Sequence, residues 1–299
     1  MDMLTITNLE KRFGDKEVLR GLNLSVPEHS VFGFVGRNGA GKTTTMKSVL
    51  GLLRPDNGEI LVSGERVSYG QTKTNRFIGY LPDVPEFYSF MTPREYLALC
   101  GQICGMKKAD ITPRGARLLE LVGLGDEKHR IKGFSRGMKQ RLGIAQALLI
   151  RPKLLICDEP TSALDPVGRK EILDILLAAR EETTVLFSTH ILSDVERICT
   201  NVAFLHEGKT AMQGSVAEIR NLHASEEFTV ETGREEDVEK LLQAFDGSVR
   251  KERNLILFRG DKNKMFSVLK YIADNQIAMQ KVEKMEPSLE SLFLEVAKP

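Results

Sequence analysis

The sequence predicts an α/β fold in which helices cover a mostly parallel β-sheet. Two observations carry this prediction. Short apolar runs that are typical of buried strands, such as residues 31–35 and 153–157, alternate with longer segments of helical periodicity, such as residues 165–182. In addition, a glycine-rich stretch, residues 36–43, joins the first of these strands to a helix predicted from Thr44 to Leu53.

Length and composition exclude several classes of protein. The chain has 299 residues, of which 41% are hydrophobic and 28% charged, and this balance argues against disorder. The net charge of +1 comes without a basic stripe, so we expect no nucleic-acid partner. No apolar run reaches the roughly 18 residues that span a bilayer, and residues 1–13 do not resemble a signal peptide. The four cysteines form no C-x-x-C pair, which fits reduced thiols in the cytosol.

The first two thirds of the chain give further predicted elements. Alternating or apolar runs predict strands at residues 4–9, 18–26, 59–63, 77–81 and 184–188, and a hairpin at residues 202–212. Thr92 and Glu95 have the spacing of a capping box, with Pro93 at the first helical position, so a helix starts there. We expect two helices between Pro93 and Leu124, and a long helix that begins at Ser135.

The pattern restarts in the last quarter of the chain. Strands are predicted at residues 228–230, 249, 255–258 and 278–285, and helices at residues 237–245, 265–273 and 288–296. This order resembles βαββαβ, the ferredoxin-like plan. The sequence therefore predicts two domains, residues 1–222 and 223–299, of which the second is a small α+β accessory domain.

The glycine-rich stretch fits the phosphate-loop pattern G-x-x-x-x-G-K-[ST]. Its glycines let backbone N–H groups point inward at a phosphate, and the following helix adds its positive N-terminal end. Lys42 would place a charge on the β- and γ-phosphates, and the Thr43 hydroxyl would bind Mg²⁺. A chance match is the alternative, but the flanking strand and helix favour the loop. The predicted ATP-binding residues here are Gly36, Arg37, Asn38, Gly39, Ala40, Gly41, Lys42, Thr43 and Thr44.

Two carboxylates follow the apolar strand at residues 153–157. Charges at that position are costly unless they bind a metal or take part in chemistry. Asp158 suits a role in binding Mg²⁺, and Glu159 suits the base that orients the attacking water. The alternative is an acidic pair that caps a helix in a turn.

Residues 134–142 carry a resemblance to a known family. They read F-S-R-G-M-K-Q-R-L, which resembles the L-S-G-G-Q signature of ATP-binding-cassette ATPases. In that family the signature, here Ser135, Arg136, Gly137 and Met138, serves the nucleotide of the opposite subunit in a head-to-tail dimer. Phe134 replaces a leucine, and Arg136 replaces the first glycine of the signature. Basic residues at this second position are familiar in the drug-exporting branch.

Other positions match the same family. The resemblance makes Asp165 a D-loop residue, His190 the switch histidine that touches the γ-phosphate, and Phe13 the aromatic that stacks on adenine. A structural histidine, or an aromatic that merely ends a strand, is the alternative for the last two. Asp83 occupies the position where the family usually carries a glutamine, and as an acid it would accept a hydrogen bond from a Mg²⁺-bound water.

The resemblance covers residues 3–220 and implies a P-loop NTPase fold with an antiparallel β subdomain and a helical subdomain at about residues 90–150. It implies the ATPase subunit of a membrane transporter, with ATP and Mg²⁺ as cofactors and separate transmembrane permease chains and a second cassette as partners. Such a subunit would lie on the inner face of the cell membrane. Residues 287–295 are similar to the ending of small-molecule exporter cassettes, which favours export.

The alternatives are a soluble cassette ATPase of DNA repair or the ribosome and a nucleotide-dependent regulator. Repair members insert a long coiled coil between phosphate loop and signature, but here only 93 positions separate Lys42 from Ser135. Ribosomal members carry two cassettes in one chain, and this chain has one phosphate loop. Glu159 and His190 are present, which argues against a regulator that senses ATP without turnover.

Overall fold

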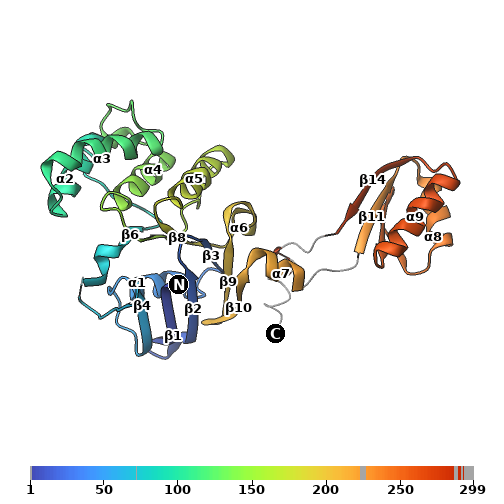
Figure 1. The fold of residues 1–299 in the computed structure, drawn as a ribbon, viewed down its shortest axis with the longest axis horizontal. Coiled ribbons are helices and arrows are strands. Elements are labelled where there is room, and N and C mark those ends of the chain that lie inside the picture. Colours follow the sequence, from blue (N-terminus) through green and yellow to red (C-terminus); the bar gives the residue numbers. More distant parts are fainter. Residues whose placement is uncertain (1, 72, 223–226, 286–288, 291, 293–299) are drawn as a thin grey trace. The chain divides into compact units, whose positions relative to one another are not determined.

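The computed structural model describes residues 2–71, 73–222, 227–285, 289, 290 and 292. The chain divides into two compact units between Ala217 and Glu218, five residues before the predicted boundary. Figure 1 shows both units, coloured along the sequence from blue to red. Among the described residues, no helix has both the length and the apolar character that crossing a membrane requires.

A six-stranded sheet forms the centre of the first unit, in the order β10-β9-β3-β8-β7-β6. The five strands from β9 to β6 run parallel, and β10 pairs antiparallel with β9 at the edge. Every residue of β3, β7 and β8 is buried, as their continuous apolar runs predict. The mostly parallel sheet is thereby confirmed. The bounds are β3 Val31–Gly36, β6 Ile78–Leu81, β7 Leu154–Cys157, β8 Thr184–Thr189, β9 Asn201–His206 and β10 Lys209–Ser215.

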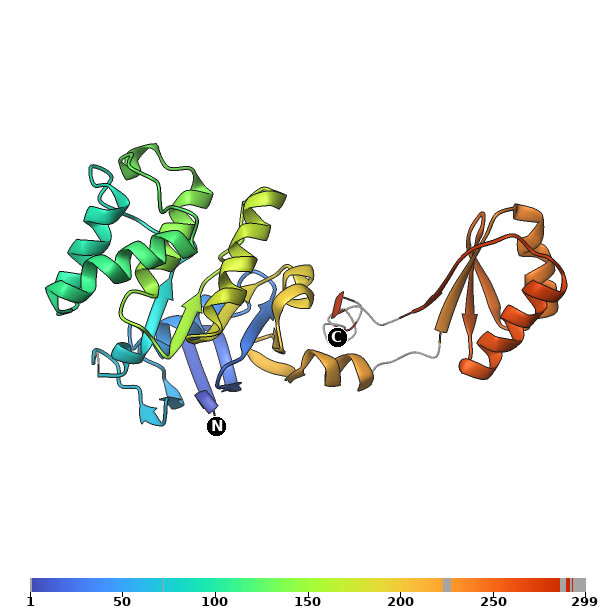
Figure 2. The same cartoon turned by 45° about the horizontal axis from the view of Figure 1, so that its top comes forward.

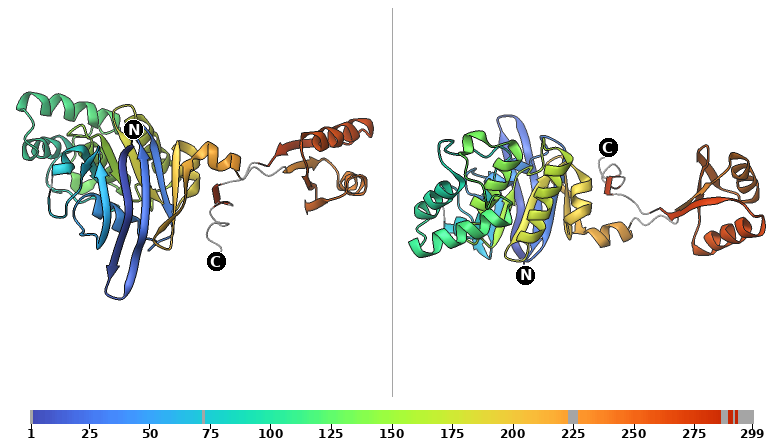
Figure 3. Two further views of the ribbon diagram at one scale, coloured as in Figure 1. Left: turned by 60° about the horizontal axis from the view of Figure 1, so that its bottom comes forward. Right: turned by 90° about the horizontal axis from the view of Figure 1, so that it is seen from above.

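A second, antiparallel sheet has the order β2-β1-β4-β5. Its strands are β1 Asp2–Phe13, β2 Lys16–Pro27, β4 Asn57–Val62 and β5 Glu65–Arg66. The β1–β2 hairpin is longer than predicted because register shifts, such as the one between Ile6 and Leu9, break the strict alternation without ending the pairing. Figure 3 shows this hairpin in dark blue at one side of the unit. The antiparallel β subdomain is confirmed.

Helices cover both faces of the parallel sheet. Helix α1, Lys42–Val49, packs its Met46 and Val49 into one core with Phe32 of β3 and with apolar residues of the antiparallel sheet. Helix α6, Leu192–Ile198, lies on the opposite face, because Val195 faces Gly33, whose neighbours in β3 point the other way. Helix α5, Pro166–Ala179, packs against β8 and α6.

The predicted helix boundaries need corrections. Helix α1 starts two residues earlier than predicted and ends at Val49, because the chain turns at Gly51 with φ of +68°. Helix α5 starts at Pro166 with Asp165 as its cap and ends at Ala179, three residues short of the prediction. Two short helices, α6 and α7 (Val216–Leu222), were not predicted.

The helical subdomain contains α2 Pro93–Ile103, α3 Lys108–Leu121 and α4 Arg136–Ala147. The capping box predicted at Thr92 and Glu95 is present in both directions. Ser135 caps α4, and its hydroxyl accepts a hydrogen bond from the backbone N–H of Met138 at 3.2 Å. Figure 2 shows these helices in green, grouped at one end of the first unit.

The second unit is a four-stranded antiparallel sheet with two helices. Its sheet order is β12-β13-β11-β14, and its element order is βαββαβ, so the predicted ferredoxin-like plan is confirmed. The bounds are β11 Glu227–Thr232, α8 Glu235–Ala244, β12 Ser248–Glu252, β13 Leu255–Arg259, α9 Lys262–Asp274 and β14 Met279–Lys284. Phe228 and Phe258 stack in its core at 5.0 Å between ring centroids. The helix predicted at residues 288–296 lies largely outside the described residues.

Candidate functional site

The phosphate loop joins β3 to α1 at the carboxyl end of the parallel sheet. Gly41 precedes α1 with φ of +112°, and a Cβ at that position would come within 2.7 Å of the Leu19 side chain. Gly39 has φ of +82° and open space around it. The loop therefore needs glycine for its backbone shape at both positions. Lys42 folds back so that its Nζ donates to the carbonyl oxygen of Gly36 at 2.6 Å.

Asp158 is a buried carboxylate with both oxygens satisfied. The Thr43 hydroxyl donates to Oδ2 at 2.7 Å, and the Ser188 hydroxyl donates to Oδ1 at 2.6 Å. Only 3% of Asp158 is exposed, so these two hydrogen bonds offset much of the cost of burying its charge. The sequence predicted Asp158 and Thr43 at one site, and the structure brings them into contact. Ser188 was missed, although a serine inside the apolar run at residues 184–188 is itself a signal.

Glu159 connects the two other charged residues predicted for catalysis. Its Oε1 lies 3.0 Å from Lys42 Nζ, and its Oε2 lies 2.9 Å from His190 Nδ1. Its backbone is left-handed, with φ of +47°, a conformation that costs a non-glycine residue roughly 1–2 kcal/mol. The Ser188 hydroxyl accepts a hydrogen bond from the Glu159 N–H at 3.0 Å and helps to hold this turn. Lys42, Glu159 and His190 thus form one chain of contacts.

These residues surround an open cavity of about 370 Å³. Nine predicted residues line it: Asn38, Gly39, Gly41, Lys42, Thr43, Thr44, Asp83, Glu159 and His190. Val18 of β2, which was not predicted, and Ser162, which begins the segment that resembles the D-loop, also line it. Phe13 is not among the described lining residues. It ends β1 half exposed, with Lys11 Nζ 5.4 Å from its ring centroid.

Burial around Asp158 changes the acidity of its neighbours. Burial, and secondly the Asp158 charge, raises the pKa of Tyr80 to about 12. Burial also raises the pKa of Cys157, which directly precedes Asp158. Both groups therefore stay neutral at physiological pH.

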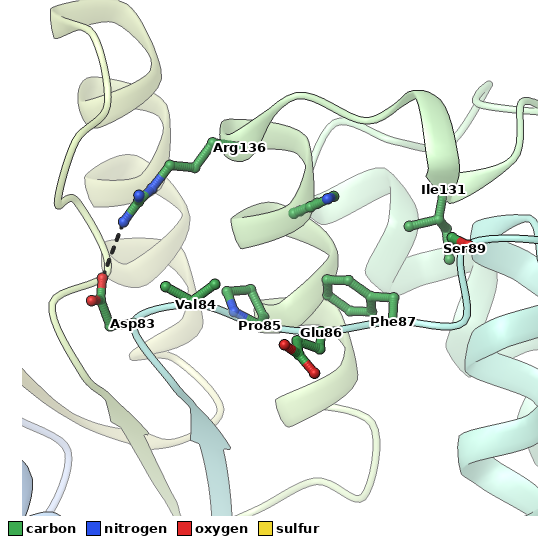
Figure 4. Close-up of a pocket in the computed structure, with 9 residues that line it drawn as sticks. Asp83, Val84, Pro85, Glu86, Phe87, Ser89, Ile131 and Arg136 are labelled. Atoms are coloured by element: carbon green, nitrogen blue, oxygen red, sulfur yellow. Dashed lines mark hydrogen bonds and ion pairs between the residues drawn. The ribbon is translucent and has the colours of Figure 1, made fainter.

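The segment that resembles the signature is not among the described residues that line this cavity, but it contacts Asp83, which does line it. Ser135 and Arg136 are exposed in the first turn of α4. Arg136 lies 3.1 Å from Oδ1 of Asp83, the acid at the end of β6 (Figure 4). Two of the three positions at which the sequence departs from the family pattern, Asp83 and Arg136, are therefore in contact, and the sequence alone did not predict this contact.

A buried acid ties the segment after Glu159 to two helices. Asp194 of α6 is 2% exposed, and its carboxylate accepts hydrogen bonds from the Thr161 hydroxyl at 2.8 Å and from Arg169 Nε at 2.6 Å. Asp165, predicted as a D-loop residue, is exposed, and its side chain accepts from the Gly168 N–H at 2.7 Å. Asp194 was not predicted, because a single acid in a seven-residue helix has no distinguishing pattern.

Comparison with known proteins places this arrangement in a family. Residues 19–162 match the family model described as ABC transporter. The chain is 42% identical over 229 residues to the ABC transporter ATP-binding protein YxlF of Bacillus subtilis, and the match covers 76% of each chain. This chain belongs to the ABC transporter ATP-binding proteins.

One further relative and one solved structure are also similar to this ABC transporter ATP-binding protein. It is 43% identical over 210 residues to the bacitracin transport ATP-binding protein BcrA of Bacillus licheniformis, over 69% of this chain and 68% of that one. The structure of cbiO1 of Clostridium perfringens, part of the ABC transporter complex cbiONQ, superposes with a TM-score of 0.68 and 28% identity, over 73% of this chain and 90% of that chain.

The second unit has its own family match. Residues 214–297 match a model described as the C-terminal domain of DrrA1-3-like ATP-binding proteins. This match spans the predicted accessory domain and the residues 287–295 from which the resemblance to exporter cassettes was drawn.

The site fits the nucleotide of an ABC ATPase. The curled loop presents backbone N–H groups and Lys42 to a phosphate, as a triphosphate requires. The Thr43 hydroxyl and the Asp158 carboxylate meet at 2.7 Å and offer the oxygen ligands that Mg²⁺ prefers. The described residues hold no cluster of three or more His, Cys, Asp or Glu, so a metal here would complete its shell with phosphate and water oxygens.

Proposed function

We propose that this chain is the ATPase subunit of a membrane exporter, in which two cassettes bind and hydrolyse ATP head to tail and drive separate transmembrane chains. The contact chain from Lys42 through Glu159 to His190 carries the hydrolytic part, since it places a phosphate-binding cation and a histidine each within 3.0 Å of the carboxylate that would act as the base. The likeness to a bacitracin transport protein supports a role in moving small molecules or peptides, with export as the direction.

The protein's contribution to hydrolysis is positioning and electrostatics. Lys42 holds the transferred phosphoryl group through its charge, and Glu159 orients the attacking water and takes its proton. His190, 2.9 Å from Glu159, holds that carboxylate in place and lines the cavity, where it would contact the γ-phosphate of a bound nucleotide. Thr43 and Asp158 would hold Mg²⁺ directly and Asp83 through a water, and the metal would neutralise charge on the phosphates.

The signature residues support the head-to-tail dimer. The first turn of α4 exposes Ser135 and Arg136, and the helix N-terminus there favours an anion. In the proposed dimer, Ser135 and Gly137 of one chain close the nucleotide cavity of the other. ATP would then act as part of the interface, and opening after hydrolysis would drive transport.

An exposed apolar surface supports a membrane-embedded partner. Val84, Tyr88 and Phe90 lie in the segment between β6 and α2 and are 63%, 55% and 62% exposed. Several large apolar side chains exposed in one short segment mark an interaction surface. We assign it to a cytoplasmic segment of the transmembrane chain, which would place this subunit on the inner face of the membrane.

The variant Glu159→Gln tests the hydrolytic assignment. The amide keeps the shape of the side chain and loses the base, so turnover should fall by about 100-fold or more while ATP binding persists. Size-exclusion chromatography with ATP and Mg²⁺ should show a stable dimer. Glu181→Gln, an exposed acid after α5, is the control and should hydrolyse ATP normally. Near-normal hydrolysis by Glu159→Gln would contradict the assignment.

Purification of the full-length chain from its own cells tests the transport assignment. A transporter subunit should bring along a polytopic membrane chain in detergent. Replacing Val84 and Phe90 together by serine should remove that chain and leave ATP binding by the isolated subunit unchanged. Purification without any membrane chain would favour a soluble ATPase instead.

A further inference from the structure

The contact between Asp83 and Arg136 joins the segment after β6 to the start of α4. Arg136 extends from the first turn of α4 and its guanidinium lies 3.1 Å from Asp83 Oδ1, which follows the end of β6 (Figure 4). A second contact fixes the same place, because Gln140 Nε2 donates to the backbone oxygen of Asp83 at 2.6 Å. Gln140 is fully buried, so the main chain at Asp83 is held firmly against α4.

Glycines allow β6 and α4 to approach closely behind this contact. A Cβ at Gly79 of β6 would lie 2.2 Å from the backbone oxygen of Ala147, and a Cβ at Gly143 of α4 would lie 2.5 Å from the Leu81 side chain. At these two positions no side chain separates the backbone of one element from the atoms of the other. The distance between Asp83 and Arg136 is set by this packing and not only by two flexible side chains.

Asp83 belongs to two cavities at once. It lines the nucleotide cavity together with Lys42, Thr43 and Glu159, and it lines a neighbouring cavity of about 430 Å³ together with Arg136. A change of charge at Asp83, or at Arg136 beside it, therefore changes the electrostatic potential in the nucleotide cavity of the same chain.

Each charge of the pair is electrostatically unfavourable at its own position, and the other charge offsets this cost. A carboxylate at the rim of a phosphate site repels the anion that the site must bind. A cation in the first turn of a helix is disfavoured by the positive end of the helix dipole, and Arg136 occupies the first residue of α4. The contact between the two side chains offsets both costs.

We propose that Arg136 is a positioning residue that acts through Asp83 on the nucleotide bound in its own chain. This role rests on the proposed nucleotide site and is separate from the action of the signature on the opposite chain's nucleotide. Arg136 balances the charge of Asp83, so the rim of the cavity stays nearly neutral toward the phosphates.

The proposal predicts a specific dependence on Mg²⁺. Without Arg136, the Asp83 carboxylate stands alone at the rim, and ATP should bind more weakly in EDTA. Added Mg²⁺ supplies positive charge to the same cavity and should remove much of this loss. A purely structural change in α4 would weaken binding equally with and without Mg²⁺.

The experiment is a double-mutant cycle with Arg136→Gly and Asp83→Asn, and Arg136→Gln is a second variant that keeps side-chain bulk. A fluorescent ATP analogue is titrated into full-length protein dilute enough to be monomeric, in EDTA and in Mg²⁺. In EDTA, either Arg136 variant should weaken binding about two- to fivefold, the range of a partly exposed ion pair. In the Asp83→Asn background the same change should have almost no effect.

Controls separate this proposal from its alternatives. Lys132→Ala removes an exposed cation just before α4 and should leave the affinity unchanged. Equal losses with and without Asp83, or an equal loss in Lys132→Ala, would overturn the proposal. An effect of Arg136 that arises only when the protein dimerises would also overturn it. Unchanged ATP affinity in Lys42→Ala would instead show that the proposed nucleotide site itself is wrong.

Discussion

The floor and the rim of the nucleotide cavity differ in how completely one chain builds them. The floor consists of Lys42, Thr43, Asp158, Glu159 and Ser188. Lys42 is 6% and Asp158 3% exposed, and each has at least two polar partners within 3.0 Å.

The rim is formed by Asp83, with Arg136 paired to it from the neighbouring cavity, and it is far more open. The side chains of Arg136 and Asp83 are 43% and 47% exposed, and their mutual contact at 3.1 Å is the one ion pair that the described residues provide for either. A floor built around the buried Lys42, Asp158 and Ser188 and their contacts is preorganised by folding alone. The rim keeps exposed groups available, which is what a site completed by a second chain needs.

Lys42→Ala should break the floor and have the largest effect. The change removes the cation that faces phosphate and leaves the carboxylate of Glu159 without its partner at 3.0 Å. We expect ATP affinity to fall by more than about tenfold and turnover by about 100-fold or more. Equilibrium titration and steady-state kinetics measure both. Lys47→Ala, an exposed lysine of the same helix, should behave as wild type.

Ser188→Ala should loosen the floor without removing a charged group. It deprives Asp158 Oδ1 and the Glu159 N–H of their common partner. The free energy of unfolding should fall by about 1–3 kcal/mol, because buried groups lose hydrogen bonds, and turnover should fall more than ATP affinity. Urea unfolding tests this. Ser267→Ala, whose exposed hydroxyl bonds within α9, should cost less than about 0.5 kcal/mol.

Truncation after Arg220 tests whether the floor depends on the second unit. All floor and rim residues precede the division of the chain, and the second unit has its own apolar core. We expect a folded chain whose ATP affinity stays within about twofold of wild type. Its ATP-dependent dimer should form less readily, because a domain of this size gains stability by packing against another surface, such as a second chain. Loss of ATP binding by a folded truncation would contradict this independence.

Glu182→Gln should have the smallest effect, a small loss in the free energy of unfolding. The change weakens a contact between the helical subdomain and the segment after α5. Partial burial acts to raise the pKa of Glu182, but the hydrogen bond from Arg114 and the charges of Arg114 and Arg117 outweigh it, so the pKa is lowered. A lowered pKa in the folded state means that this stabilisation is present above the unfolded-state pKa of about 4.3 and is lost as the pH falls below it.

At pH 7 the Glu182→Gln variant should therefore lose at most about 1 kcal/mol of the free energy of unfolding, since solvent screens this partly exposed carboxylate. At pH 3, below the unfolded-state pKa, the difference between wild type and variant should be smaller than at pH 7. Thermal unfolding at both pH values measures the difference. A larger loss at pH 3 than at pH 7 would contradict the predicted sign.

The floor could be predicted from sequence and the rim contact could not, for a physical reason. The loop at residues 36–43 and the acids after β7 are local patterns whose chemistry depends on neighbours in the chain. The contacts of Asp158 with Ser188, and of Asp83 with Arg136, join residues 30 and 53 positions apart. Only the packing of whole strands and helices decides such pairs.

Short elements were also beyond the sequence pattern. Helices α6 and α7 have seven residues each, about two turns, and that is too few to show a helical period. The ferredoxin-like unit was predicted correctly, because its strands and helices are each long enough to show alternation or periodicity and follow one another in a simple order.

The close contact between Gly79 and Ala147 has a mechanical consequence. Because no side chain separates β6 from α4 there, the helix cannot slide or roll against the strand without a collision at the backbone. A rotation or shift of α4 therefore also displaces β6, which belongs to the central sheet. Helices α2 and α3, in contrast, are joined to the end of α4 through side chains, such as the hydrogen bonds of Tyr96 with Gln146 and of Arg114 with the backbone of Leu148.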